Sequence, residues 1–250
     1  MAGIQDAPRL YRFLKRVLPP IMRPMFHMQI EGLEHVPQYE PVIFAANHLS
    51  FIDSIFLPLS VDRPIYFLGK ADYFDSWKTR WFFRGAGVVP VNRQGGDKGM
   101  DSLLTGVKIL RSGDPIGIYP EGTRSPDGRL YRGKTGPVRM ALMADAPVIP
   151  VGLIGTDVVM PADRYLPRRN PVTVRFGRPL EFSRYRGREE DPFVLRSATD
   201  ELMYEIMILS GQEYVDEYAS NVKSGEVKLD QDLTRPPSAG DRGDATRRAS

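Results

Sequence analysis

Short apolar runs alternate with longer, helix-like stretches from Met28 onward in this chain. Apolar residues recur at helical spacing over residues 98–112 and 134–145. Six other runs are short and continuously apolar, as buried strands are: 42–46, 65–68, 88–91, 115–119, 148–154 and 172–176. This alternation predicts an α/β fold, a single domain with a central, mostly parallel mixed sheet flanked by helices.

The first 28 residues carry a different pattern, in which cations alternate with large apolar side chains. Five Arg or Lys residues lie between positions 9 and 23 among Leu, Phe, Tyr, Ile and Met. We interpret residues 1–28 as a basic amphipathic helical segment, broken at Pro19 and Pro20 because proline lacks an N–H. Such a segment either lies on a membrane surface or packs on the domain with a solvated basic face.

The end of the chain changes character again. Asp191 and Pro192 are typical of a helix start, and Gly211 is typical of a helix end. Residues 213–250 are polar and rich in Asp, Arg, Ser, Gly and Pro, so we expect a disordered tail that cannot bury enough apolar surface to fold. The folded domain is therefore expected to cover residues 29–212.

Charge and composition narrow the class of protein. The formal net charge is +3, which fits a nucleic acid, a membrane surface or an anionic substrate as partner. The basic residues do not form a strip interleaved with aromatics, so nucleic acid is not expected. The chain has no cysteine, no secretory signal and no run of ~20 apolar residues, so we expect a cytoplasmic location without a membrane span.

One candidate catalytic motif directly follows the apolar run 42–46. In Asn47-His48-Leu49-Ser50-Phe51-Ile52-Asp53, Ser50 and Asp53 have the spacing of a capping box, which predicts a helix from Ser50 and leaves His48 on the preceding loop. Side chains five positions apart on one helix point about 140° apart, so His48 and Asp53 can meet only in that arrangement. A histidine oriented by a carboxylate is suited to act as a general base. The alternative is a loop histidine beside an ordinary helix cap.

A second motif, Tyr119-Pro120-Glu121-Gly122-Thr123-Arg124-Ser125, follows the run 115–119. It presents a carboxylate, a hydroxyl, a guanidinium and a glycine on one loop, which suits capture of a phosphate. The alternative is a solvated turn with surface charges.

Both motifs together resemble the glycerophospholipid acyltransferases, also called the lysophosphatidic acid acyltransferase or PlsC-like family. His48 and Asp53 match its first block, and Glu121 to Arg124 match its third. Residues 87–93 (GVVPVNR) and 148–151 (VIPV) resemble the second and fourth blocks in the right order. The resemblance covers about residues 29 to 182 and makes 29–212 the acyltransferase catalytic domain.

The resemblance implies roles for individual residues. His48 would be the catalytic base and Asp53 its orienting partner. Six positions would hold the phosphorylated acceptor: Lys70, Arg93, Glu121, Gly122, Thr123 and Arg124. Lys134 is either a further cation of that site or a solvated loop lysine. Tyr119 departs from the family, which commonly has phenylalanine there.

The expected reaction moves a fatty acyl group from acyl-CoA or acyl carrier protein to the free hydroxyl of a lysophospholipid, foremost 1-acyl-sn-glycerol-3-phosphate, giving phosphatidic acid. We expect no metal and no cofactor beyond the acyl donor, and no covalent acyl-enzyme, because neither a cysteine nor a Gly-x-Ser-x-Gly sequence is present. The expected location is the cytoplasmic face of a membrane, reached through residues 1–28. Three alternatives stay open: a hydrolase with the same His-Asp pair, a glycolipid acceptor, and a non-catalytic membrane-surface scaffold.

Overall fold

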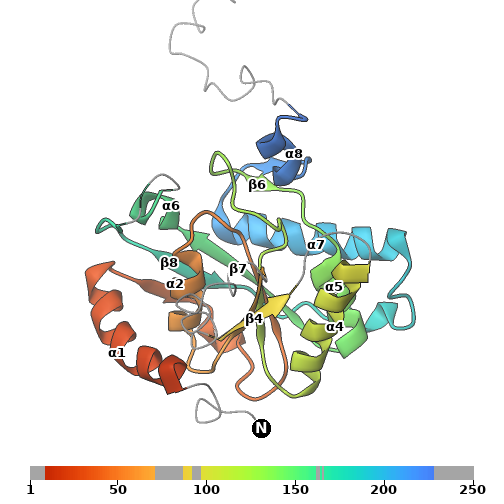
Figure 1. Cartoon of the computed structure of the whole chain (residues 1–250), viewed down its shortest axis with the longest axis horizontal. Coiled ribbons are helices and arrows are strands. Elements are labelled where there is room, and N and C mark those ends of the chain that lie inside the picture. The colour runs from red at the N-terminus through yellow and green to blue at the C-terminus, as the bar shows by residue number, and fades with distance from the viewer. Residues whose placement is uncertain (1–8, 71–86, 92–96, 162–163, 165, 228–250) are drawn as a thin grey trace, which may run out of the picture.

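Figure 1 shows the computed structural model of the chain, which describes residues 9–70, 87–91, 97–161, 164 and 166–227. A seven-stranded sheet forms its centre, in the order β1-β8-β7-β2-β5-β3-β4. Its strands are β1 (Gln29–Glu31), β2 (Ile43–Ala46), β3 (Tyr66–Lys70), β4 (Val88–Val91), β5 (Ile116–Ile118), β7 (Val148–Ile154) and β8 (Thr173–Phe176). The six predicted strands are therefore confirmed, and β1 is an addition at the sheet edge.

Helices cover both faces of this sheet. The α-helices in the described part of the chain are α1 (Arg9–Met25), α2 (Asp53–Ser60), α4 (Asp97–Arg111), α5 (Gly136–Ala144), α6 (Thr156–Val159), α7 (Pro192–Ser210) and α8 (Ala219–Ser224). Two short 3-10 helices span Leu33–His35 and Ser183–Tyr185. The predicted helices over 98–112, over 134–145 and from Pro192 correspond to α4, α5 and α7.

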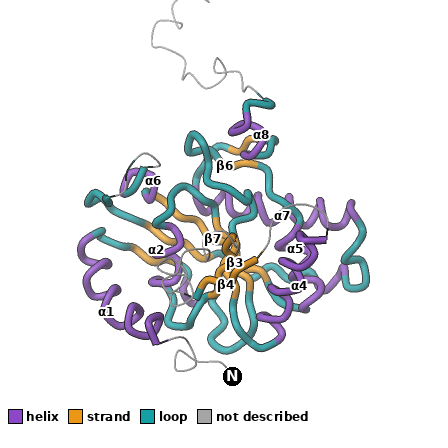
Figure 2. The backbone as a smooth tube through the Cα atoms, viewed as in Figure 1, coloured by secondary structure: helices purple, strands orange, loops and turns teal. Residues whose placement is uncertain are grey.

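Two hydrophobic clusters lie on opposite faces of the sheet. Successive side chains of a strand point to opposite faces. Ile43 and Ala45 of β2 therefore join the cluster with α4, α5 and α7, whereas Phe44 and Ala46 join the one with α2. Figure 2 shows the corresponding layers, with α1 and α2 on one side of the strands and α4, α5 and α7 on the other. Burial on both faces explains why the β2 sequence is continuously apolar rather than alternating.

Strand direction decides where the loops meet. Every neighbouring pair in the large sheet is parallel except β7 and β8, which are antiparallel. This confirms the mostly parallel mixed sheet. Because β2, β5, β3 and β4 are parallel neighbours, their carboxyl ends lie along one edge, where open α/β sheets bind ligands.

The N-terminal helix differs from the expectation at its prolines. The predicted break at Pro19 and Pro20 is wrong, because α1 continues through both residues to Met25. Contacts on both sides of the prolines hold the helix, because Arg23 after them donates to the Leu59 carbonyl at 3.1 Å and two residues before them are bonded as well. The Tyr11 hydroxyl accepts a hydrogen bond from the Ile65 N–H, and the Lys15 ammonium donates to the carbonyls of Pro58 and Val61. Tertiary packing thus overrides the local cost of the prolines.

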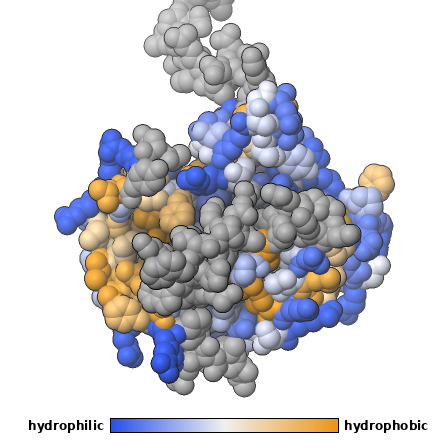
Figure 3. Space-filling model, viewed as in Figure 1, coloured by the Kyte–Doolittle hydropathy of each residue, from blue (hydrophilic) through white to orange (hydrophobic). Residues whose placement is uncertain are grey.

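The outer face of α1 is both apolar and basic. Phe13 is 61% exposed, Ile21 48% and Met25 36%. The exposed arginines Arg9 and Arg16 lie on the same helix. Figure 3 shows an apolar patch in the region of α1 at the left of the molecule. Within the described residues, no helix is long and apolar enough to cross a bilayer.

The end of the domain lies beyond its predicted boundary. The prediction of a disordered tail from residue 213 is wrong for residues 213–227, because β9 (Tyr214–Val215) pairs in parallel with β6 (Leu130–Tyr131) and α8 follows. Ala219 is fully buried, and the Arg132 guanidinium lies 5.6 Å from the centre of the Tyr218 ring. A few aromatic and small residues suffice for this docking, and the average composition of the last 38 residues conceals them. Residues 228–250 lie outside the described part.

Candidate active site

The predicted site residues follow four neighbouring parallel strands. His48 comes after β2, the loop 119–125 after β5, Lys70 ends β3, and Arg93 comes two residues after β4. The sheet therefore brings the backbone of the first three to one edge. The Lys70 side chain and all of Arg93 lie outside the described residues, so their roles as acceptor ligands stay predictions.

His48 and Asp53 meet as predicted. The distance from His48 Nδ1 to Asp53 Oδ2 is 2.8 Å, and the Asp53 carboxyl is fully buried whereas the His48 side chain is 16% exposed. A carboxylate on Nδ1 fixes the proton there and leaves Nε2 as the basic nitrogen. The ring is thus oriented as a general base requires.

The local backbone differs from the predicted capping box. Helix α2 begins at Asp53, three residues later than expected, and its Ncap residue Ile52 makes no side-chain cap. Half of the capping box is nevertheless present, because Asp53 Oδ2 accepts from the Leu49 and Ser50 N–H groups at 2.8 Å each. The Ser50 hydroxyl accepts from the Ile52 N–H at 3.4 Å and donates to the Met160 carbonyl at 2.5 Å, so Ser50 also fastens the loop to the segment after α6.

Glu121 joins the two motifs. One of its carboxylate oxygens accepts from the His48 N–H and the other from the Tyr131 N–H, both at 3.0 Å, and the Ser125 N–H donates to the His48 carbonyl at 2.7 Å. Burial raises the pKa of Glu121 to about 7, although both N–H bonds act against that rise. Glu121 is therefore a buried link between the loops, and each of its carboxylate oxygens accepts a backbone N–H.

Tyr119 lies against the candidate base. Its ring stacks on His48 with the centroids 3.9 Å apart and the planes at 10°, and its hydroxyl lies 3.1 Å from Ser54 Oγ. Burial, with the nearby Asp53 carboxylate, raises the pKa of Tyr119 well above its ordinary value, so the hydroxyl stays protonated. Tyrosine in place of the family's phenylalanine thus adds a hydrogen bond with Ser54 and keeps an aromatic ring stacked on His48.

Cations surround the exposed side of the loop 121–125. Gly122 has φ 74°, a left-handed conformation that glycine adopts without strain, and a Cβ there would lie 3.3 Å from Lys134 Nζ. Lys134 therefore lies beside the loop, where a further cation of the acceptor site would be expected. Among the described residues, the Arg124 guanidinium has no ion pair or hydrogen bond. Thr123 and Arg124 are both partly exposed.

Sequence reasoning missed several residues that hold the site together. Asn47 donates to the Leu153 carbonyl at 2.9 Å and accepts from the Leu153 N–H at 2.7 Å, which fastens the end of β2 to that of β7. Asn47 also donates to Gln212 Oε1 at 2.7 Å. The position of Asn47 directly before His48 was the only local signal. Gln212 carried none, because it is 165 residues away in the sequence.

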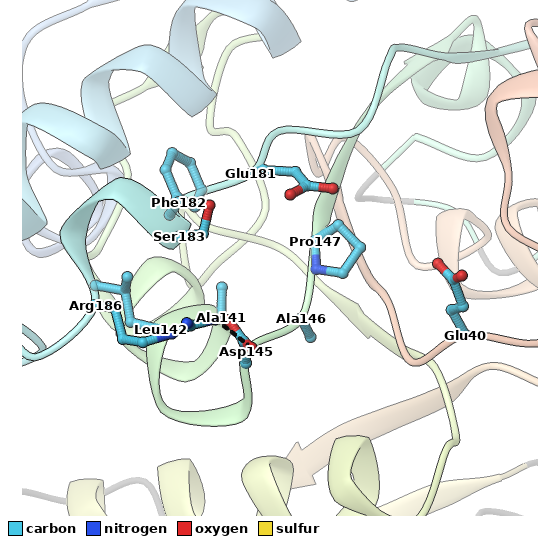
Figure 4. A pocket seen from close by; sticks show the side chains of 10 residues that line it. All are labelled: Glu40, Ala141, Leu142, Asp145, Ala146, Pro147, Glu181, Phe182, Ser183 and Arg186. Carbon is cyan, nitrogen blue, oxygen red and sulfur yellow. Dashed lines mark hydrogen bonds and ion pairs between the residues drawn. The ribbon is translucent and has the colours of Figure 1, made fainter.

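A separate hollow of about 240 Å³ lies by the C-terminal end of α5 (Figure 4). Polar side chains line it, including Glu40, Glu181 and the ion pair of Arg186 with Asp145 at 2.6 Å. None of the predicted site residues is part of it. In the part of the chain that the structure describes, no three His, Asp or Glu side chains come together as metal ligands would.

Fold and site together define an α/β protein with a carboxylate-oriented histidine beside a cationic loop, as in enzymes that deprotonate a hydroxyl. The Acyltransferase family model matches residues 27–154, which contain both motifs, and the chain belongs to this family.

Several acyltransferases are similar to this chain in sequence. The chloroplastic 1-acyl-sn-glycerol-3-phosphate acyltransferase LPAT1 of Arabidopsis thaliana is 33% identical over 155 residues, which are 61% of this chain and 43% of that protein. A Bacillus subtilis 1-acyl-sn-glycerol-3-phosphate acyltransferase is 27% identical over 173 residues, 68% of this chain and 82% of that protein. The chain thus spans less than half of the chloroplastic relatives.

A solved structure shares the fold. The crystal structure of the 1-acyl-sn-glycerophosphate acyltransferase PlsC from Thermotoga maritima superposes with a TM-score of 0.60 at 21% identity, covering 88% of this chain and 83% of that one. Because the match extends well beyond residues 27–154, it supports the arrangement of the whole sheet and its helices.

Proposed function

We propose that the protein is an acyltransferase that moves a fatty acyl group from an acyl thioester to the free hydroxyl of 1-acyl-sn-glycerol-3-phosphate, giving phosphatidic acid. The observation that carries this is the joining of two sites. The His48–Asp53 base and the cationic loop 121–125 are held together through Glu121, which bonds the His48 N–H at 3.0 Å. The names of the relatives support the choice of acceptor.

In the proposed reaction, His48 Nε2 takes the proton of the acceptor hydroxyl as its oxygen attacks the thioester carbonyl. The C–S bond breaks, and the thiolate receives the proton from the imidazolium. Asp53 keeps Nδ1 protonated and stabilises the imidazolium charge. The two substrates react directly, so the protein contributes orientation of both reactants, which can lower a barrier by as much as ~7–11 kcal/mol.

The acceptor phosphate would bind at the loop 121–125. Arg124 and Lys134 supply charge there, and Thr123 adds a hydroxyl. Glu121 and Gly122 would contribute to the same site by shaping the loop that presents these groups. We propose Lys70 and Arg93 as further ligands, since both follow parallel strands that end at the same edge. No cofactor or metal takes part in this scheme, and either acyl-CoA or acyl carrier protein could donate the acyl group.

We further propose that α1 places the protein on the cytoplasmic face of a membrane. Exposed Phe13, Ile21 and Met25 would enter the interface, and Arg9 and Arg16 would meet anionic headgroups. Sedimentation with phosphatidylglycerol-containing vesicles tests this, since neutral vesicles should retain much less protein.

The central experiment measures transfer from labelled oleoyl-CoA to 1-oleoyl lysophosphatidic acid and identifies the product by mass. We expect phosphatidic acid from the wild type and none above background from His48→Ala. His27→Asn is the matched control, because His27 is exposed and lies outside the site, and asparagine tolerates its left-handed φ of 42°. Undiminished transfer by His48→Ala would defeat the catalytic role of His48.

A thioesterase with the same pair is the second candidate, because a histidine base can activate water as well as an alcohol. The same reactions run without lysophosphatidic acid separate the two. Free oleate as the main product, whether or not the acceptor is present, would favour the hydrolase. The cationic loop weighs against it, because thioester hydrolysis needs no phosphorylated acceptor.

A further inference from the structure

Helix α8 contacts the loop 121–125, although Lys223 and Thr123 are 100 residues apart in the sequence. The Lys223 ammonium donates to Thr123 Oγ1 at 3.1 Å and to the Arg124 carbonyl. On its other side the same loop is bonded to the backbone of His48 through Glu121 and Ser125. Lys223 is thus bonded to the loop that also holds the candidate base.

Like charges gather at this point of the loop. Partial burial and, after it, the nearby Arg124 guanidinium lower the pKa of Lys223, and the Glu121 carboxylate only partly opposes this shift. Among the described residues, neither Lys223 nor Arg124 nor Lys134 forms an ion pair with a carboxylate. Glu121, the acidic residue of the loop, is turned inward toward two backbone N–H groups. Cations held together in this way repel one another and are relieved by a bound anion.

We infer that Lys223 is an acceptor-binding residue, which adds its charge beside the loop 121–125 to the site for the phosphate monoester of the acceptor. This rests on the proposed function. The family match ends at residue 154, so the motif that defines the family does not include this lysine. Helix α8 is then part of the substrate site rather than an appendage of the domain.

The test compares Lys223→Met and Lys223→Arg with Lys108→Met, a matched exposed lysine at the end of α4. Loss of one charged contact should raise the KM for lysophosphatidic acid about tenfold in Lys223→Met. The KM for oleoyl-CoA should stay within about twofold, and Lys223→Arg should recover most of the loss because its charge is kept. The effect should shrink in 0.5 M NaCl.

A neutral acceptor separates binding of phosphate from support of the loop. With 1-monooleoylglycerol, which lacks the phosphate, Lys223→Met and wild type should have equal KM values. An equal rise for both acceptors, or no rise for lysophosphatidic acid, would overturn the inference. If the wild type did not acylate lysophosphatidic acid, the proposed function would fail by itself. Calorimetric binding of inorganic phosphate would then decide, with equal affinity in wild type and Lys223→Met contradicting the role.

Discussion

Replacing Asp53 by asparagine tests how the candidate base is oriented. Oδ2 of Asp53 accepts three hydrogen bonds of 2.8 Å, from His48 Nδ1 and from the N–H groups of Leu49 and Ser50. Oδ1 is buried and has no partner among the described residues. The two backbone donors should therefore hold the amide oxygen of asparagine in the place of Oδ2. The amide NH₂ would take the place of Oδ1, so His48 Nδ1–H keeps an acceptor.

The size of the effect follows from what is kept and what is lost. The tautomer of His48 is kept, and the negative charge facing the imidazolium is lost. A hydrogen bond to a charged group contributes about 1.5–3 kcal/mol, so kcat/KM should fall by roughly 10- to 150-fold. That is far below the ~10⁴-fold loss seen where an asparagine forces the wrong tautomer on a catalytic histidine.

Thiol release from oleoyl-CoA, followed with a chromogenic disulfide at saturating acceptor, gives the rate. Asp53→Ala is the reference, since it no longer fixes the tautomer of His48 and leaves the Leu49 and Ser50 N–H groups without their acceptor. It should lose more activity than Asp53→Asn. Urea midpoints must show that both variants are folded. A folded Asp53→Asn that loses activity as completely as Asp53→Ala would refute the argument from the backbone donors.

Two further changes probe the surroundings of His48. Because the pKa of Glu121 is raised from 4.5 to about 7 in the folded protein, its stabilising contribution is present below about pH 4.5 and is lost as pH rises to about 7, at ~1.4 kcal/mol per pH unit. As pH rises over that window, the urea midpoint of the wild type should therefore fall relative to that of Glu121→Gln. A constant difference between the two midpoints would contradict the raised pKa. Tyr119→Phe removes the contact with Ser54 Oγ but keeps the ring on His48, so it should cost about 0.5–1.5 kcal/mol of stability. Its kcat should change little, in contrast with Tyr119→Leu, which removes the stack.

The pairing of His48 with Asp53 was predictable because it depends on local backbone geometry. A helix starting after His48 was enough to bring the two side chains together. The details were not predictable, since α2 begins at Asp53 and the carboxylate reaches back to Leu49 and Ser50. The meeting of the two motifs also follows from the pattern, because parallel strands align their carboxyl ends.

The hydrophobic pattern of the sequence could not predict contacts between residues far apart in the chain. Gln212 binds Asn47 and Lys223 binds Thr123, yet both come from the end of the chain that composition marks as tail or boundary. The docking of residues 213–227 depends on single side chains such as Ala219, and an average over 38 residues cannot show it. Continuity of α1 through Pro19 likewise depends on tertiary bonds that no local propensity contains.

One short helix connects the proposed membrane face to the proposed chemistry. Lys15 and Arg23 of α1 donate to carbonyls at the C-terminal end of α2, Arg23 to Leu59 at 3.1 Å. Cations are favoured at that end of a helix, where the last carbonyls lack partners within it. The first residue of the same helix is Asp53. Since α2 has eight residues and spans only ~12 Å, its contacts with the cations of α1 and the carboxylate that orients His48 lie at opposite ends of one short helix.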